Sequence, residues 1–130
     1  MKPKWSGYLS VLVILALIAG SGILSQLYLE RTAAEMLARL ETIKIDIEQN
    51  NWEASLANYT AFHKSWHPVR ENWVLFIDHN QINNVESRLA RLGEQLKARL
   101  QSEALAELSE TILLLQQIPE SERLTWRNIL

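Results

Sequence analysis

The sequence contains no cysteine, which excludes disulfides, thiolate metal sites, thiol nucleophiles and a lipid-modified N-terminal cysteine. Glycine and proline are scarce, with four and three residues among 130, and no glycine-rich loop of the kind that holds phosphate groups occurs. The chain is long enough for one small domain. Its abundance of leucine, alanine, glutamate, glutamine and arginine favours helices over sheets.

Charge is missing from the start of the chain. No charged residue occurs from Trp5 to Leu29, and the stretch YLSVLVILALIAGSGILSQLYL, residues 8–29, is long enough to cross a bilayer as a helix, for which about 20 residues are needed. Lys2 and Lys4 precede it, so the positive-inside rule leaves the N-terminus in the cytoplasm and the bulk of the chain outside. We therefore predict a single-pass protein of the cell membrane. Its parts are residues 1–7 as a cytoplasmic N-terminus, 8–29 as a transmembrane helix and 30–130 as an extracytoplasmic helical domain.

A cleaved signal peptide is the alternative to a retained anchor. A basic start, a short apolar core from Val11 to Ile18 and the small residues at 19–22 favour it. The apolar run continues to Leu29, past the point where cleavage would fall. This continuation favours the anchor.

The part of the chain after the span is acidic. From Glu30 onward it carries 11 Lys and Arg against 15 Asp and Glu, a net charge of −4. An acidic domain without a basic stripe is a poor candidate for binding nucleic acid or an anionic membrane surface. We therefore predict no nucleic-acid partner.

Four stretches after the span carry apolar residues at three- and four-residue spacing, which predicts amphipathic helices. The first, residues 30–49, follows the span without a breaker, so the two can form one long helix. Asn51 is a natural N-cap for the second helix, Asp78 is one for the third, and Ser102 is the expected cap of the fourth. The predicted fold is all-α: one N-terminal transmembrane helix followed by an antiparallel bundle of three to four helices.

Two prolines fall within the predicted helices. The hydrophobic pattern passes through Pro68 without losing phase, so we predict a kinked but continuous second helix, with Pro68 as the first residue of a new helix as the fallback. Pro119 is expected to end the fourth helix or to open a short tail that ends in LTWRNIL and packs back. The predicted core faces of the third and fourth helices are Ile82, Val85, Leu89, Leu92, Leu96 and Leu100, and Leu105, Leu108, Ile112 and Leu115. Leu113 and Leu114 widen the second of these faces, which predicts a helix covered on two sides.

Aromatic residues form a row along the predicted second helix. Trp52, Tyr59, Trp66 and Trp73 recur at heptad spacing, and Trp126 lies in the apolar tail. We expect most of these rings in the bundle core and some at the surface, as anchors for a protein contact.

All three histidines fall between Ala61 and Asn80. His63 and His67 are four residues apart, the spacing at which two imidazoles on one helix can share a zinc ion. Glu71, the next residue in line, is about 12 Å from His63 along the helix axis, too far for the same ion. Without a third ligand we predict no metal site and no cofactor, with His63 half-buried beside the aromatic row and His67 exposed.

The pair Asp78-His79 is a candidate for acid–base chemistry, because a carboxylate can orient an imidazole for proton transfer. Adjacent side chains on a helix diverge, however, and no nucleophile or phosphate-binding loop indicates a reaction. We predict that Asp78 caps the third helix, that His79 packs or forms a hydrogen bond at the turn, and that the chain is not an enzyme.

The order of features along the chain is distinctive. A basic start and one span are followed by NWEAS at a helix start, tryptophans at 66 and 73, FIDHNQINNVESRLARL, and ALAELSETILLLQQIPESERLTWRNIL. This order resembles an uncharacterised family, a domain of unknown function, of short single-span proteins from spore-forming Gram-positive bacteria. The likeness covers nearly the whole chain, and its most specific parts are Ile77-Asp78-His79 with Ile82 and Val85-Glu86, and the closing Asn128-Ile129-Leu130.

The resemblance implies a membrane-anchored helical domain that faces outward, and it implies no activity. Gln81-Ile82-Asn83 stands where relatives tend to carry a glutamate-isoleucine-aspartate run, which weakens acid-based chemistry at this point.

The expected function is a non-enzymatic module for protein–protein interaction or scaffolding that docks on another membrane or envelope protein. Gly20 and Gly22, with Ser21 and Ser25, would let span helices approach closely, so a homo-oligomer is a further expectation. The alternative function is a helical bundle that senses a small ligand or a metal around His63, His67 and His79.

Overall fold

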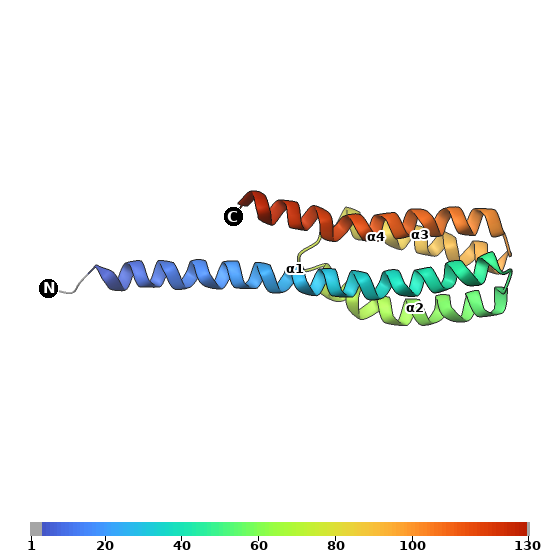
Figure 1. The fold of residues 1–130 in the computed structure, drawn as a ribbon, viewed down its shortest axis with the longest axis horizontal. Coiled ribbons are helices and arrows are strands. Elements are labelled where there is room, and N and C mark those ends of the chain that lie inside the picture. The colour runs from blue at the N-terminus through green and yellow to red at the C-terminus, as the bar shows by residue number, and fades with distance from the viewer. Residues whose placement is uncertain (1–3, 130) are drawn as a thin grey trace.

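The computed structural model describes residues 4–129, and every regular element in this range is an α-helix. In chain order the helices are α1 (Trp5–Glu48), α2 (Trp52–Trp73), α3 (His79–Lys97) and α4 (Gln101–Ile129), as Figure 1 shows. The predicted all-α class is therefore confirmed. Two residues used in the predictions lie outside the described range. These are Lys2, one of the two lysines that set the predicted orientation, and Leu130, the last residue of the family resemblance.

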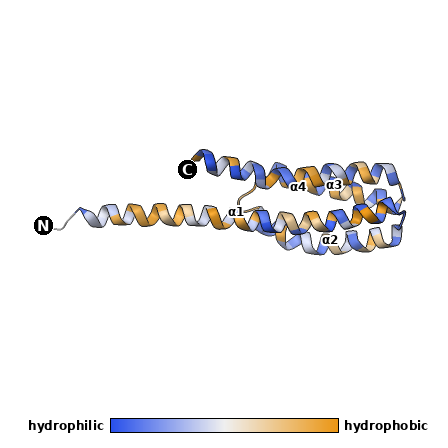
Figure 2. Cartoon of the chain, viewed as in Figure 1, coloured by the Kyte–Doolittle hydropathy of each residue, from blue (hydrophilic) through white to orange (hydrophobic). Residues whose placement is uncertain are grey.

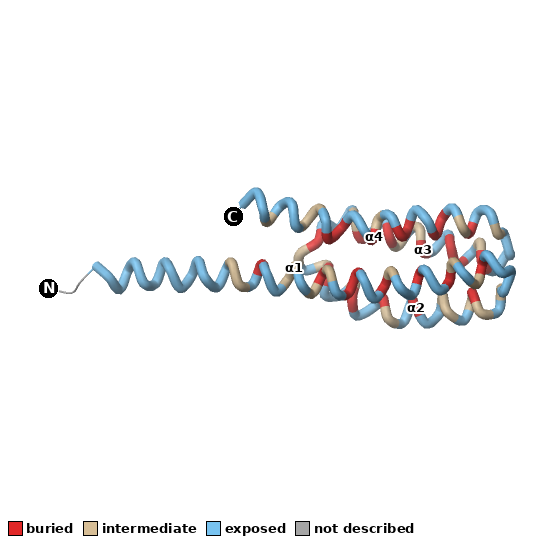
Figure 3. The backbone as a smooth tube through the Cα atoms, in the orientation of Figure 1, coloured by how far each residue is buried: buried red, intermediate tan, exposed pale blue. Residues whose placement is uncertain are grey.

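The helix α1 joins the apolar stretch to the bundle without a break. It has 44 residues, which corresponds to about 66 Å at 1.5 Å per residue. Its first half projects from the rest of the molecule as an exposed apolar helix (Figures 2 and 3). Within the described range, α1 is the one helix that is long and apolar enough to cross a membrane, a criterion of length and composition that a signal sequence also meets.

The second half of α1 belongs to an antiparallel four-helix bundle. α1 packs against α2 and α4, and α3 packs against the same two helices, so each helix has two neighbours. The exposed half of α1 and the last turns of α4 lie at the same end of the bundle, which we call the proximal end (Figure 1). The connections α1–α2 and α3–α4 lie at the opposite, distal end.

The bundle core consists of apolar side chains that recur at helical spacing, which Figure 3 shows as a buried strip along the inner faces. The predicted inner faces of α3 and α4 are largely confirmed, with two exceptions. Leu100 is 43% exposed because α3 ends at Lys97 and Leu100 lies in the connection to α4. Leu113 is 47% exposed because it points away from the core, so the prediction that α4 is covered on two sides is wrong at this residue.

The caps of α2 and α3 agree with the predicted helix starts. The Asn51 side chain accepts a hydrogen bond from the Ala54 amide at 3.2 Å, and the Asp78 side chain accepts one from the Asn80 amide at 3.0 Å. Ser102 is not a cap, because α4 begins one residue earlier, at Gln101. The Gln101 side chain instead donates to the Ile47 carbonyl at 3.1 Å and so ties the start of α4 to the end of α1.

The two prolines both lie inside helices. α2 continues through Pro68, as predicted. α4 also continues through Pro119, so the prediction of a helix end or tail at this residue is wrong. Pro119 is buried against the bundle and its carbonyl accepts a hydrogen bond from the Gln26 side chain at 3.0 Å, contacts that hold the helix in place where proline has removed a backbone bond.

Candidate functional site

The tryptophans of the aromatic row lie inside the bundle. Trp66 and Trp73 are buried and meet edge to face, with ring centroids 5.3 Å apart. Each indole N–H has a partner: Trp66 donates to Glu86 Oε1 at 2.8 Å, and Trp73 donates to the Thr32 hydroxyl at 2.9 Å. These two rings are therefore packing residues of the core. Trp52 is half-buried at the distal end.

Tyr59, also in this row, joins α2 to α3. Its hydroxyl donates to the Leu89 carbonyl at 2.6 Å. Gly93 leaves the space for the ring, since a Cβ at this position would lie 2.7 Å from the Tyr59 oxygen. Burial raises the pKa of the Tyr59 phenol, and the charges of Glu86 and Glu94 raise it further. The phenol is thus held neutral as a hydrogen-bond donor.

The histidines lie on the outside of the bundle. His63 and His67 line one small hollow of about 150 Å³ together with Arg70 and Glu86. Glu86 Oε1 already accepts from Arg70 Nε at 2.8 Å and from the buried indole of Trp66, so this carboxylate is engaged. No cluster of three or more side chains suited to binding a metal ion occurs among residues 4–129.

The prediction that His63 is half-buried is wrong. The side chain is exposed because its position on α2 faces outward, and its ring meets that of Tyr59 edge to face, with centroids 5.1 Å apart. His67 is exposed, as expected. Asp78 caps α3, whereas His79 is exposed rather than packed at the turn, and it does not line the hollow of the other two histidines.

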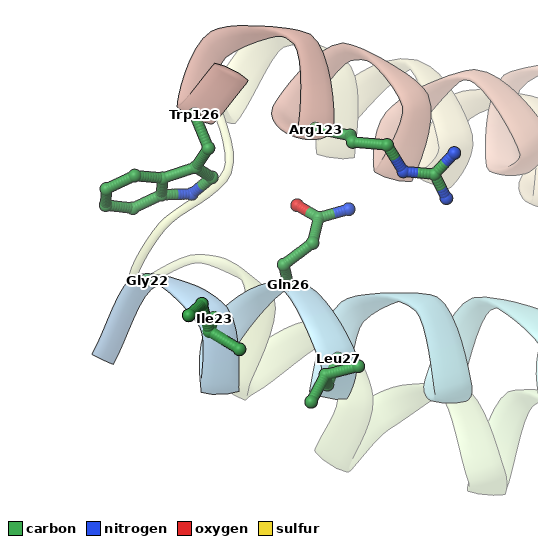
Figure 4. Close-up of a pocket in the computed structure, with 6 residues that line it drawn as sticks. All are labelled: Gly22, Ile23, Gln26, Leu27, Arg123 and Trp126. Carbon is green, nitrogen blue, oxygen red and sulfur yellow. The ribbon is translucent and has the colours of Figure 1, made fainter. Parts of the chain in front are cut away.

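A cavity of about 160 Å³ lies at the proximal end, between α1 and the last turns of α4 (Figure 4). Its lining residues are Gly22, Ile23, Gln26, Leu27, Arg123 and Trp126. The Trp126 ring lies over Gly22, and a Cβ there would come within 2.9 Å of the ring. The tail therefore packs back at Trp126, by close approach to a glycine of the predicted span.

Polar contacts fasten α4 to α1 beside this cavity. Gln26 Nε2 donates to Glu30 Oε1 at 3.1 Å and to the Pro119 carbonyl at 3.0 Å. Because both partners are acceptors, the amide nitrogen must face them, and the buried Gln26 Oε1 has no partner within residues 4–129. The Arg123 guanidinium binds Glu30 through Nε at 3.0 Å and through a second nitrogen, and it lowers the pKa of the Glu30 carboxyl.

A wider groove of about 700 Å³ runs between α1 and α2. Small side chains such as Ala38 and Ser65, together with Pro68 inside α2, line the open space. Met36 and Val69 are buried beneath it. The remaining lining residues are Tyr28, Arg31, Thr32, Glu35 and Arg39.

The charged side chains along this groove lack ion-pair partners in the described part of the chain, and the Arg31 guanidinium lies over the Tyr28 ring, 6.0 Å from its centroid. Arg31, Glu35 and Arg39 are exposed on α1, and in the described part of the chain none of them forms an ion pair. Some other arginines on the bundle surface differ in this respect, for example Arg88, which binds Glu107 at 2.8 Å. The groove thus combines an apolar floor with free charges, a combination that sequence patterning did not indicate because it depends on how α1 and α2 are paired.

No curated protein and no solved structure matches the chain. A family model described as a domain of unknown function, DUF4363, matches residues 23–129. The matched range begins where α1 meets Trp126 and ends with α4, so it corresponds to the bundle. The expected resemblance to a family of unknown function is confirmed. Because the match extends over well more than half of the sequence, the chain belongs to the DUF4363 family.

Proposed function

We propose that the chain is a non-enzymatic, membrane-anchored module that docks on another membrane or envelope protein outside the cytoplasmic membrane. The N-terminus lies in the cytoplasm in this proposal, and the host is a Gram-positive bacterium, in keeping with the resemblance noted from the sequence. The observation that carries the proposal is the unbroken course of α1 from the exposed apolar half into the bundle. A continuous helix cannot act as a flexible linker, so it would hold the bundle at a set height and orientation, which suits docking.

The anchor and the bundle share residues of α1 in this proposal. The uncharged stretch from Trp5 to Leu29 is longer than the roughly 20 residues that a bilayer requires. The 17 residues from Trp5 to Ser21 reach the lower end of the roughly 17–25 residues found in membrane spans, so the last part, from Gly22 to Leu29, can contribute to the bundle while the preceding part crosses the membrane.

The groove between α1 and α2 is the proposed docking surface. Arg31 and Arg39 flank Glu35 on one helix face, which gives the rim a net positive charge in an otherwise acidic domain. An amphipathic partner helix with apolar residues and a carboxylate at matching positions would fill the groove and neutralise the rim. Several charged side chains elsewhere on the bundle are engaged with one another, as in the pairs Arg70–Glu86 and Arg88–Glu107.

Photocrosslinking in intact membranes tests this proposal. A photoreactive amino acid replaces Ala38 in the groove, and the matched control carries it at Ala106, an exposed alanine on the outer face of α4. We expect one recurrent heterologous adduct from position 38, weakened severalfold by Arg39→Glu, and no such adduct from position 106. Equal labelling from both positions, or none from position 38, would contradict docking in the groove. Adducts with a second copy of the chain would indicate a homo-oligomer.

Ligand or metal sensing is the second candidate. One observation favours it: His63 and His67 line the same hollow. Zinc titration of the purified chain should then raise its midpoint of thermal unfolding, and His63→Ala should abolish the increase. An unchanged midpoint would remove this candidate.

A further inference from the structure

The last turns of α4, residues 120–129, carry apolar side chains that the bundle does not cover. Leu124 is 50% exposed and Ile129 is 68% exposed. Trp126 is half-buried, with one face of its ring on Gly22. Figure 1 shows that this segment extends past the connection between α2 and α3 and lies alongside the exposed half of α1.

The position of Trp126 along α1 matches a membrane boundary. If Trp5 marks the inner interface, Gly22 lies about 26 Å further along the helix at 1.5 Å per residue, close to the roughly 30 Å of a bilayer's hydrocarbon core. Trp126 packs on Gly22 and so falls at the outer boundary of this core. Tryptophan is enriched at both membrane interfaces, where its ring is apolar and its N–H remains in contact with polar groups.

The apolar surface of this segment continues that of α1. Ile23 and Leu27 of α1 are exposed and line one cavity with Trp126, so exposed apolar side chains of α1 lie beside the segment that carries Leu124 and Ile129. Ile129 lies one helical turn beyond Trp126 in the direction of the projecting half of α1, so it would lie deeper than Leu124.

Charge in the segment is balanced. Glu120 and Glu122 offset Arg123 and Arg127, and Arg123 is paired with Glu30. An interaction with a bilayer would therefore rest on apolar burial and would not require anionic lipid. Arg127 can place its guanidinium among the headgroups while its stem stays apolar.

We infer that residues 120–129 form a second membrane contact, in which Leu124, Trp126 and Ile129 insert at the headgroup–acyl boundary of the outer leaflet. This inference rests on the proposed anchor. The occupant of the exposed face is phospholipid, because the face continues the apolar surface of the anchoring helix at the depth where its hydrocarbon-spanning part ends. Two membrane contacts, one through α1 and one through α4, would prevent the bundle from tilting.

Spin-label depth measurements test the inference, and the absence of cysteine makes single labelling sites straightforward. The full chain is reconstituted in phosphatidylcholine nanodiscs, with the variants Leu124→Cys and Ile129→Cys. Ser109→Cys, exposed on α4 within the bundle, is the aqueous control, and Ile14→Cys reports on the anchor. Each label is tested for collisions with oxygen, which concentrates in lipid, and with a water-soluble nickel complex.

We expect the ratio of oxygen to nickel collisions to be severalfold higher at positions 124 and 129 than at position 109, and higher at 129 than at 124. The ratios should not change when phosphatidylglycerol is added. A lipid-like ratio at 14 with water-like ratios at 124 and 129 would overturn the inference and leave the anchor intact. A water-like ratio at 14 would overturn the anchor, and the inference with it. Low collision rates with both reagents at 124 and 129 would overturn the inference in favour of a protein contact.

Discussion

At the scale of single residues, the bundle is held by polar groups placed among large apolar ones. The indole N–H of Trp73 and the hydroxyl of Thr32 form a buried pair between α2 and α1, and the same hydroxyl donates to the Tyr28 carbonyl at 2.8 Å. Buried donors cost free energy when they lose their acceptor. Such pairs therefore specify the rotation of one helix against the next as well as contributing to stability.

The exchange Thr32→Val tests this role. Valine has a similar shape, but it leaves the Trp73 N–H buried without an acceptor, so we expect the free energy of unfolding to fall by about 1–3 kcal/mol. Thr42→Val is the control, since the Thr42 hydroxyl is exposed and bonds only to a carbonyl of its own helix. The control should change stability by less than about 0.5 kcal/mol. Guanidinium denaturation in detergent, followed by the near-ultraviolet signal of the tryptophans, measures both, and equal effects would contradict the role.

Tyr59 gives a prediction that depends on pH. The pKa of the Tyr59 phenol is raised in the folded state, first by burial and then by two nearby carboxylates. The phenol of the unfolded chain ionises at about pH 10. The contribution of Tyr59 to stability is therefore fully present below this pH and is lost as pH rises through the pKa of the folded state. Tyr59→Phe removes the hydrogen bond to Leu89 and should cost about 1 kcal/mol at neutral pH. The difference between wild type and variant should shrink above pH 10. Denaturation midpoints that differ by a constant amount from pH 7 to pH 11 would refute this linkage.

At the scale of helices, local chemistry was sufficient to predict the starts of α2 and α3, but not the start of α4 at Gln101 or its course past Pro119. Asn51 and Asp78 bind amides within three residues of themselves, so their cap roles are local and the sequence predicts them. The course of α4 beyond Pro119 depends on Gln26, which is distant in sequence. The exposed position of His63 likewise depends on the rotation of α2 within the bundle, and periodicity alone does not determine it.

Gly22 and Trp126 test how the end of α4 is held. In Gly22→Leu the new side chain would occupy the space of the Trp126 ring, so residues 120–129 should detach from α1 while the core stays folded. The expected readout is faster hydrogen exchange of the amides in this segment, with unchanged exchange in α3. Gly20→Leu is the matched control, because no atom lies within 4 Å of a Cβ at Gly20. If both variants exchange alike, the contact does not hold the segment.

At the scale of the whole molecule, the sequence allows the apolar stretch and the first bundle helix to form one helix, but it does not locate the boundary between the two parts of α1. Hydropathy marks residues 8–29 as one apolar block, and nothing local separates the exposed apolar part from the part that packs in the bundle. The structure makes this division near Gly22, where α4 begins to cover α1, and the family match begins at the next residue. The sequence left the number of bundle helices at three to four for the same reason. α1 supplies one of the four bundle helices and also the apolar helix that projects from the bundle.

Two fragments test where the folded unit begins. A fragment of residues 22–129 keeps Gln26, Leu29 and Glu30, whereas one of residues 31–129 lacks all three. Leu29 is 1% exposed, and loss of a buried leucine alone costs about 3–5 kcal/mol. The shorter fragment should therefore be less stable by at least about 3 kcal/mol, a margin that urea denaturation in buffer resolves. Equal stability would mean that the bundle does not need the apolar residues before Arg31. The folded domain would then begin at the first charges after the span, as the charge pattern alone predicts, and the contact of α4 with α1 at Gly22 would contribute nothing to folding.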